Sequence, residues 1–107
     1  MSPRKEHPPD ELDPIEAGAR RLNLTLSPTL RYVLAMVCAG RSNEEIAAEL
    51  NVAERTAKNY VSSLLGMAKV DNRAALIAEV LAGKNNVQRA VTLAKKAWVA
   101  SPRRGAP

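Results

Sequence analysis

SNEEIAAELNVAERTAKNYVSSLL, residues 42–65, is the stretch of this chain whose pattern decides the fold. Apolar residues recur every three or four positions in two blocks, which is the spacing of helices that bury one face. These positions are Ile46, Ala47 and Leu50 in the first block, then Ala57, Val61, Leu64, Leu65 and Ala68 in the second. Residues 51–53 between the blocks are long enough only for a tight turn. The stretch therefore predicts two short amphipathic helices joined by a turn.

The opposite face of the second helix carries polar side chains that can donate hydrogen bonds. These are Arg55, Lys58, Asn59, Ser62 and Ser63. Donors of this kind suit phosphate oxygens and the edges of bases. Two helices joined by a tight turn, the second offering such donors, form the layout of a helix-turn-helix. Plain solvation is the alternative for polar residues on an exposed helix face, and Thr56 can instead bond locally at the helix start.

Length and composition limit the rest of the architecture. A chain of 107 residues allows one small domain with tails, which a bundle of four or five helices would fill. Ala and Leu are abundant, Phe is absent and β-branched runs between turn residues are missing, so helix is the only strong periodicity. We expect an all-α fold without a large catalytic cleft.

Capping residues place the helices that precede residue 42. Residues 1–12 are rich in Pro and charge, and we expect a disordered leader there. Asp13 followed by proline predicts the start of a short helix over residues 13–23. Ser27 followed by proline predicts the first helix of the core, which Gly40 ends. The apolar face expected for that core helix consists of Leu30, Val33, Leu34, Val37 and Cys38.

Similar signals place the helices after residue 42. Either Ser42 or Asn43 caps the helix over 43–50, and the next helix spans 54–69. Asp71 or Asn72 caps a helix over 73–81, which Gly83 stops. That helix offers one apolar stripe at Ala74, Ile77, Ala78 and Leu81 and another at Leu76 and Val80. Residues 85–86, Asn-Asn, can cap a last helix within 84–100, and residues 101–107 form a basic flexible tail.

The charge of this chain is unevenly distributed. The formal net charge is +5. Residues 27–83 nevertheless carry six basic and six acidic side chains, so the central region is neutral. The excess follows Gly83, in a segment without any acid. Its basic residues are Lys84, Arg89, Lys95, Lys96, Arg103 and Arg104. General attraction to polyanions should therefore depend on the C-terminal segment.

Several classes of site lack support in the sequence. Cys38 is the single cysteine and lies in an apolar helical segment, which favours a small buried side chain over a reactive thiol. His7 is the single histidine, and carboxylates do not cluster with it. We therefore expect no metal site, no cofactor and no enzymatic activity. Without a signal peptide core or a membrane-length apolar run, we expect a cytoplasmic protein that is nucleoid-associated when bound to DNA.

The segment over residues 24–82 resembles the LuxR-type, or GerE-like, DNA-binding domain of bacterial transcription regulators. The resemblance rests on residues 26–28 (LSP), 33–34 (VL), 40–50 (GRSNEEIAAEL), 56–60 (TAKNY) and 64–65 (LL). A helix-turn-helix pattern alone would be weak evidence for the family. The signal here is specific because the Gly-x-Ser-Asn-x-Glu-Ile-Ala block within residues 40–50 is followed at a set distance by the Thr and Lys of residues 56–60. The resemblance implies a four-helix domain over 24–83, to which this chain adds a C-terminal helix.

The resemblance also implies roles for individual residues. The helix over 54–69 would lie in the major groove of double-stranded DNA. Base contacts would come from Lys58, Asn59 and Ser62, and backbone contacts from Arg55, Thr56, Tyr60 and Ser63. Family members usually dimerise through the fourth helix of the domain, which here offers Ala74, Ile77, Ala78 and Leu81. Lys and Asn suit guanine and adenine respectively, each good contact contributing about 1–3 kcal/mol of discrimination.

At four places the sequence differs from the residues that are usual in the family. Leu30 stands where the family usually has Glu, and Tyr60 replaces the usual His. Ala53 replaces a capping Ser, a change typically worth about 1 kcal/mol. Lys69 occupies the position where a glycine normally takes positive φ, and Gly66 weakens the helix before it. We therefore expect the recognition helix to end differently here, and sooner.

The helix over 84–100 lies outside the family domain, and three roles are open for its apolar face. Val87, Val91, Ala94 and Trp98 could be core, a dimer seam or a docking surface. A membrane-surface helix is a weaker alternative. For its cations and those of the tail we expect phosphate contacts outside the groove, which raise affinity without adding sequence preference. These auxiliary residues are Arg89, Lys95, Lys96, Arg103 and Arg104.

The sequence thus predicts a sequence-specific DNA-binding transcription regulator that acts as a homodimer. Two alternatives stay open at this point. One is a module similar to sigma-factor region 4, which contacts both promoter and RNA polymerase. The other is a protein-interaction adaptor that has kept the fold without DNA binding and uses the surface around Trp98. Because 107 residues leave no room for a receiver or ligand-binding domain, we expect control through abundance, oligomerisation, RNA polymerase or another regulator.

Overall fold

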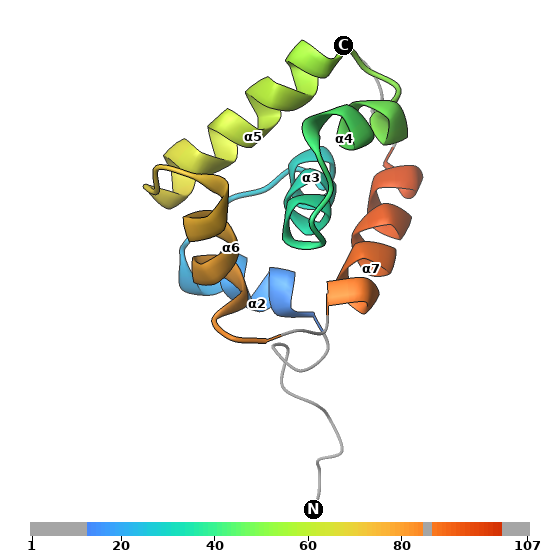
Figure 1. The fold of residues 1–107 in the computed structure, drawn as a ribbon. Coiled ribbons are helices and arrows are strands. Elements are labelled where there is room, and N and C mark those ends of the chain that lie inside the picture. The colour runs from blue at the N-terminus through green and yellow to red at the C-terminus, as the bar shows by residue number, and fades with distance from the viewer. Residues whose placement is uncertain (1–12, 85–86, 102–107) are drawn as a thin grey trace, which may run out of the picture.

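The computed structural model describes residues 13–84 and 87–101. This part of the chain contains six α-helices and no strand, which confirms the expected all-α fold (Figure 1). The helices are α2 (Pro14–Arg21), α3 (Pro28–Cys38), α4 (Asn43–Leu50), α5 (Glu54–Ala68), α6 (Arg73–Leu81) and α7 (Val87–Ala100). The leader expected over 1–12, the cap at 85–86 and all of the expected tail after residue 101, including Arg103 and Arg104, lie outside the described residues.

Side-chain caps start the helices where the sequence predicted. Asp13, Ser27, Ser42 and Asn72 each accept hydrogen bonds from backbone N–H groups in the first turn of α2, α3, α4 and α6. At α4 the cap is reciprocal. Glu45 N donates to Ser42 Oγ at 3.1 Å, and Ser42 N donates to Glu45 Oε1 at 2.9 Å. Each such cap satisfies backbone donors that a helix start would otherwise leave unpaired.

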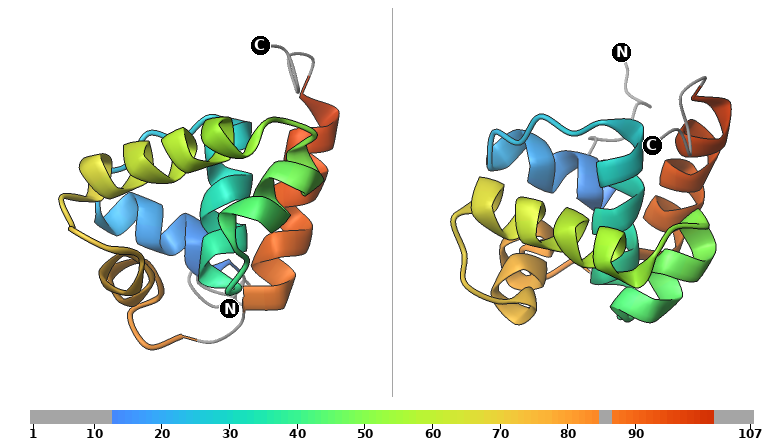
Figure 2. Two further views of the ribbon diagram at one scale, coloured as in Figure 1. Left: turned by 45° about the horizontal axis from the view of Figure 1, so that its top comes forward. Right: turned by 90° about the horizontal axis from the view of Figure 1, so that it is seen from above.

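Helix α3 lies at the centre of the bundle, with the other helices around it (Figures 1 and 2). All seven residues from Tyr32 to Cys38 are buried. Seven consecutive residues cover every side of a helix with 3.6 residues per turn. Of the expected apolar face, Val33, Leu34, Val37 and Cys38 are buried and Leu30 is half-buried. The sequence did not predict that Tyr32, Ala35 and Met36, on the other sides of α3, are buried as well. The physical reason is that α2 and α7 cover the side of α3 that the helix-turn-helix leaves open.

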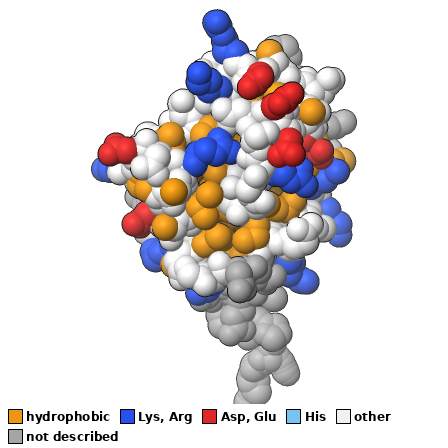
Figure 3. All heavy atoms as spheres, viewed as in Figure 1, with side chains coloured by type: hydrophobic (Ala, Val, Ile, Leu, Met, Phe, Trp, Pro, Cys, Tyr) orange, Lys and Arg blue, Asp and Glu red, His pale blue; other side chains and the backbone are white. Residues whose placement is uncertain are grey.

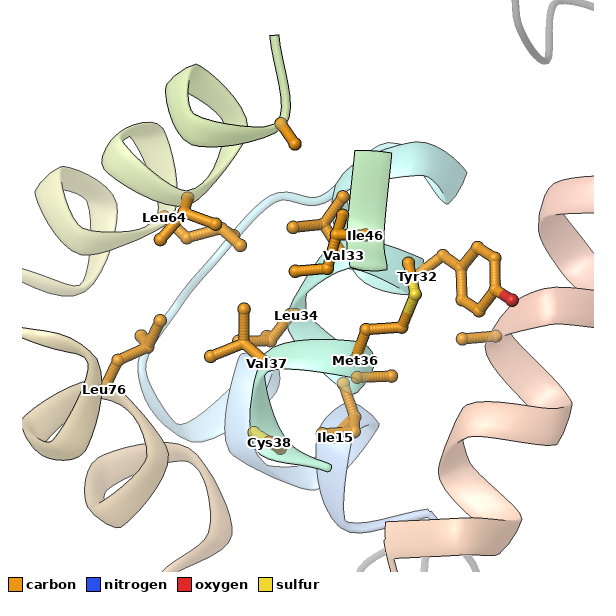
Figure 4. Close-up of a cluster of buried hydrophobic side chains, with 14 of the residues drawn as sticks. Ile15, Tyr32, Val33, Leu34, Met36, Val37, Cys38, Ile46, Leu64 and Leu76 are labelled. Carbon is orange, nitrogen blue, oxygen red and sulfur yellow. The ribbon is translucent and has the colours of Figure 1, made fainter. Parts of the chain in front are cut away.

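The hydrophobic core gathers side chains from every helix around α3. Figure 4 shows Ile15 of α2, Ile46 of α4, Leu64 of α5 and Leu76 of α6 directed towards the α3 side chains, all of them fully buried. On α6 the core stripe is Leu76 with Val80. The second apolar stripe of α6 therefore faces away from the centre of the core.

Helix α7 belongs to the core. Ala90 and Ala94 are buried, and Val87, Val91 and Trp98 pack against the buried cluster. The rings of Trp98 and Tyr32 have centroids 5.3 Å apart at an interplanar angle of 38°. Small residues at 90 and 94 let the backbones of α7 and α3 approach closely. Of the three roles that the sequence left open for the apolar face of α7, the structure supports core packing.

Helix α2 is held to α3 and α6 by an ion pair, a hydrogen bond and a close contact. Arg31 Nη2 on α3 lies 2.6 Å from Asp13 Oδ2 and 3.0 Å from Glu16 Oε1. Arg21 Nη2 donates to the backbone carbonyl of Val80 at 3.2 Å. Next to that carbonyl, Gly18 packs so closely that α6 leaves no space for a side chain. Helix α2 is therefore an integral layer of the bundle.

Candidate nucleic-acid interface

Helices α4 and α5 pack against each other and form the helix-turn-helix predicted over residues 42–65. Asn51 ends α4 in the left-handed conformation with φ 61°, which turns the chain sharply. Val52 N then donates to Ala47 O at 3.0 Å and closes the turn. The buried face of α5 consists of Ala57, Val61 and Leu64. This packing fixes which side of α5 faces solvent.

The exposed face of α5 brings together most of the predicted contact residues. Arg55, Lys58, Asn59 and Ser62, together with Glu54, line one solvent-open hollow of about 560 Å³. Helix α5 runs along an outer edge of the molecule, so a long ligand can approach this face without meeting another helix (Figure 2). The four predicted donors thus form one surface within the first nine residues of the helix.

The other predicted backbone contacts lie outside this hollow. Ser63 is exposed, Thr56 is half-buried, and Tyr60 is half-buried against the hydrophobic core. Sequence reasoning missed Glu54 as a member of the surface. A carboxylate in the first turn of a helix is usually explained by the helix dipole, which hides any second role.

The recognition helix starts without a side-chain cap, as the sequence predicted. Ala53 occupies the cap position of α5, and none of its side-chain atoms accepts a hydrogen bond there. The main-chain geometry of a helix start is still present, because Ala53 is extended and its carbonyl accepts from Ala57 N at 3.2 Å.

The end of the recognition helix contradicts the expectation of an earlier or different stop. Helix α5 continues to Ala68, and Lys69 itself takes the left-handed conformation with φ 60° and ψ 44°. Lys69 N donates to Gly66 O at 3.2 Å, and Val70 N donates to Leu65 O at 3.1 Å. The left-handed conformation costs a non-glycine residue about 1 kcal/mol or more. Two closing hydrogen bonds and the packing of Leu65 and Val70 on the core offset that cost.

Arg73 fixes the start of α4, which sequence reasoning also missed. Its Nη1 donates to Asn43 Oδ1 at 2.7 Å, and its Nη2 donates to the carbonyl of Arg41 at 2.5 Å. A forked guanidinium is suited to bridging two such acceptors. The first helix of the helix-turn-helix is thus tied to α6 as well as packed on α5. No sequence signal separates this arginine from an ordinary surface cation.

The predicted auxiliary cations of α7 fall into two groups. Arg89 and Lys96 are exposed. Lys95 Nζ, by contrast, lies 3.1 Å from Glu49 Oε2 on α4, and the Tyr32 hydroxyl donates to the same oxygen at 2.5 Å. The hydrogen bond from Tyr32, followed by that from Lys95, holds the pKa of Glu49 below its usual value. Lys95 therefore already has an anionic partner within the domain.

The predicted dimer residues lie on the outer stripe of α6. Ala74 and Ala78 are exposed, while Ile77 and Leu81 are half-buried and pack partly on the core.

In Figure 3 acidic and basic side chains are interspersed on the upper part of the visible face, in keeping with the neutral charge of residues 27–83. Hydrophobic side chains show lower on this face.

Possible metal ligands are not clustered within the described residues, and the single cysteine is buried. No three His, Cys, Asp or Glu side chains in residues 13–84 and 87–101 are placed to hold a metal ion. Burial raises the pKa of the Cys38 thiol to about 12, so this thiol is protonated at neutral pH. Over the same residues, every helix is too short or too polar to span a bilayer.

Comparison with known proteins gives two curated relatives with names. Over 51 residues, 48% of this chain and 21% of the relative, the chain is 39% identical to the "Probable HTH-type transcriptional regulator GfsR" of Streptomyces halstedii. Over 69 residues, 64% of this chain and 32% of the relative, it is 36% identical to the "Probable transcriptional regulator ycf29" of Cyanophora paradoxa. The matched region thus spans only about a fifth to a third of these relatives. No solved structure gives a significant match.

A family model describes the same region. The model of "Bacterial regulatory proteins, luxR family" matches residues 24–80, which are more than half of the chain. The matched residues comprise the loop before α3, α3 itself, the helix-turn-helix and nearly all of α6, while α2 and α7 lie outside them. The helix order and the positions of the turn and caps agree with the motifs that carried the resemblance. The chain therefore belongs to the LuxR family of bacterial regulatory proteins.

Proposed function

We propose that this protein binds double-stranded DNA in a sequence-specific manner and regulates transcription. The observation that carries the proposal is the solvent-exposed surface on α5, where Arg55, Lys58, Asn59 and Ser62 lie together. An α-helix fits the major groove of B-DNA, whose base edges present a distinct pattern of donors and acceptors for each base pair. The names of both relatives, each a probable transcriptional regulator, support the same proposal.

The roles within this surface follow from side-chain chemistry. Lys58, Asn59 and Ser62 would read base edges, because they project from the exposed side of α5 within its first nine residues. Arg55, Thr56, Tyr60 and Ser63 would contact the sugar-phosphate backbone. Since the helix-turn-helix packing fixes the orientation of α5, the backbone contacts would set its register and the base contacts its specificity.

The charge distribution assigns specific contacts and general attraction to DNA to different parts of the chain. The helix-turn-helix region is neutral, so long-range attraction to DNA has to come from elsewhere. We assign this auxiliary role to Arg89 and Lys96, which are exposed on α7, and to Arg103 and Arg104 in the tail. Lys95 would join them only by exchanging its contact with Glu49 for a phosphate.

Selection of bound duplexes from a random pool tests sequence-specific binding directly. We expect a defined recognition sequence to be enriched. The variants Lys58→Ala and Asn59→Ala should each relax the preference at particular base positions, at a cost of about 1–3 kcal/mol for the preferred base. The measurement is the affinity for the selected duplex and for each single-base variant of it.

The matched control changes a cation on another helix. Lys96→Ala should weaken binding to all duplexes alike and reduce the salt slope of log K by about 1. The Lys58→Ala effect should instead depend on the base at one position. Equal affinity of the unaltered protein for random and selected duplexes would rule out sequence-specific regulation.

We further propose that the protein dimerises through the outer stripe of α6. Two copies of Ala74, Ile77, Ala78 and Leu81 would face each other across a two-fold axis, and the DNA would then carry two half-sites about one helical turn apart. Small side chains at 74 and 78 would let the two helices approach closely. Of these four side chains, Ile77 and Leu81 are the largest, and both are half-buried against the core of their own chain.

Sedimentation of charged variants tests this dimer. Ile77→Asp should convert a dimer into a monomer, because burying a carboxylate at the centre of the interface costs several kcal/mol. Ile77 also packs partly on the core, so Ala74→Glu, at a fully exposed position, provides a second variant that leaves the fold intact. Glu79→Lys, at an exposed position of the same helix outside the stripe, is the control. An unchanged mass for both Ile77→Asp and Ala74→Glu would eliminate this interface.

The alternative functions have less support from the molecule. The adaptor hypothesis used the surface around Trp98, but that ring packs against Tyr32 in the core. The match of the luxR family model to residues 24–80 favours a LuxR-type regulator over a sigma-like module. RNA polymerase and other regulators are the protein partners that the proposed activity implies. A LuxR-type regulator and a sigma-like module both have to bind DNA, and the duplex selection described above tests that binding.

A further inference from the structure

A groove separates α7 from the first helix of the helix-turn-helix. Its volume is about 570 Å³, and α3 forms its floor with Tyr32 and Met36. Residues from Gln88 to Ala100 of α7 form one wall, and Glu49 of α4 lies on the other. Pockets that hold small organic molecules span roughly 300–1,000 Å³. The groove lies apart from the DNA-facing surface of α5, since the two sets of lining residues have no member in common.

The walls of this groove are largely apolar. Val91 is half-buried, and Val99 is 48% exposed. Among the residues that the structure describes, Val99 is the only large hydrophobic side chain classed as exposed. Water solvates Val99 and the exposed Ala100 in the free protein, so an apolar ligand group that covers them would be favoured by the hydrophobic effect.

The rim of the groove carries an excess of positive charge. Arg41, Lys95 and Lys96 line it, against the single carboxylate of Glu49. That carboxylate is already occupied by the Tyr32 hydroxyl and by Lys95. Within residues 13–84 and 87–101, Arg41 and Lys96 have no acidic side chain within ion-pair distance. The Tyr32 hydroxyl lowers the pKa of Glu49 most, and Arg41 contributes to this lowering by its attraction over a longer distance. Three cations nevertheless face this one carboxylate, so the rim keeps an excess of positive charge.

We propose that this groove binds an amphipathic organic anion. Its apolar body would lie on Val91, Val99 and Ala100, and its carboxylate, sulfonate or phosphate group would meet Arg41 and Lys96. Charge complementarity selects an anionic ligand over a neutral one, and the apolar walls select an organic anion over an inorganic one. The ligand would rest against α4, the helix that packs on the recognition helix.

The size of the groove favours a small molecule over another protein. A stable protein partner typically covers about 800 Å² of each surface, far more than one groove beside a single helix offers. The lining residues of α7, from Gln88 to Ala100, extend over roughly 18 Å at 1.5 Å per residue. A single compact molecule with one acidic group fits both the length and the charge.

Binding of 8-anilinonaphthalene-1-sulfonate to the full chain tests the proposal, because this probe joins an aromatic body to one sulfonate. Trp98 is the only tryptophan, and its ring lies 5.3 Å from that of Tyr32 on the groove floor. Bound probe should therefore quench Trp98 emission by energy transfer, saturating at one molecule per chain. Decanoate should displace the probe, whereas decanol at the same concentration should displace much less.

Two charge reversals on the same helix provide the matched comparison. Lys96→Glu should weaken probe binding about tenfold, which corresponds to about 1.4 kcal/mol. Arg89→Glu changes the net charge equally but lies outside the groove lining, so the dissociation constant should stay within about twofold, an effect of screened distant charge. Thr92→Phe, at an exposed lining position, should fill the groove and abolish binding while the thermal midpoint is unchanged.

Three results would overturn the proposal. One is the absence of saturable binding, and another is a stoichiometry well above one, which indicates adsorption of the dye to general apolar surface. The third is an equal loss for Lys96→Glu and Arg89→Glu. The assay contains no DNA, so each of these results leaves the proposed DNA-binding function to its own test.

Discussion

Replacement of Ala94 by Glu should lower the free energy of unfolding by about 3–5 kcal/mol, the cost of an unpaired buried charge. Ala94 is 1% exposed in the contact between α7 and α3. The α3 residues from Tyr32 to Cys38, against which α7 packs, are all hydrophobic, so a carboxylate at residue 94 would lose its water. Domains of this size are stable by about 5–15 kcal/mol, so the loss is a large part of the total.

The control is Ala97→Glu, at an exposed position of the same helix. Its effect should stay within about 1 kcal/mol, because it adds only a carboxylate near the negative end of the helix dipole. Urea denaturation followed by far-UV circular dichroism measures both variants. If both lose the same small amount of stability, α7 is a surface attachment and its assignment to the core is wrong.

Replacement of Gly18 by Ala should destabilise the protein by about 1–3 kcal/mol, the usual range for overpacking. A Cβ atom at residue 18 would lie 2.3 Å from the carbonyl oxygen of Val80 and 2.8 Å from its Cγ1. The carbonyl belongs to α6 and also accepts the hydrogen bond from Arg21. Helices α2 and α6 would have to separate, and the contact of Arg21 would lengthen. The thermal midpoint should fall by roughly 5–15 °C.

The same substitution at Gly66 should have the opposite sign. Gly66 lies inside α5 with helical φ, and a Cβ atom there would meet nothing within 4 Å. Gly66→Ala should therefore stabilise the protein by about 0.5–1 kcal/mol, the ordinary difference between the two residues in a helix. Differential scanning calorimetry of both variants gives the comparison. A rise in the midpoint for Gly18→Ala would show that α2 is not packed as closely as described.

Local signals in the sequence were sufficient to place the helices. Caps at Asp13, Ser27, Ser42 and Asn72 act within the first turn that they start, so they can be recognised from a few neighbouring residues. The buried face of α5 follows from the period of 3.6 in the same way. Lys69 misled the prediction, because the motif that closes α5 depends on packing of Val70 and not only on the residue type at positive φ.

The candidate site was partly predictable for the same reason. Residues on one exposed side of one helix can be grouped from their spacing, and the hollow on α5 contains the predicted Arg55, Lys58, Asn59 and Ser62. Contacts between distant parts of the chain could not be grouped in this way. Arg73 with Asn43, and Lys95 with Glu49, are separated by 30 and 46 positions, and no periodicity links them.

The sequence by itself determined the helices, their caps, the helix-turn-helix and the polar face of α5, because hydrogen bonding and side-chain period act over a few residues. Only the tertiary structure decided that α3 is buried on all sides and that α7 completes its cover. It alone placed Gly18 against Val80 and opened a groove between α7 and α4. These features depend on which helices pack against each other. The apolar pattern of one helix does not specify its packing partner, because the same pattern can pack against several different helices.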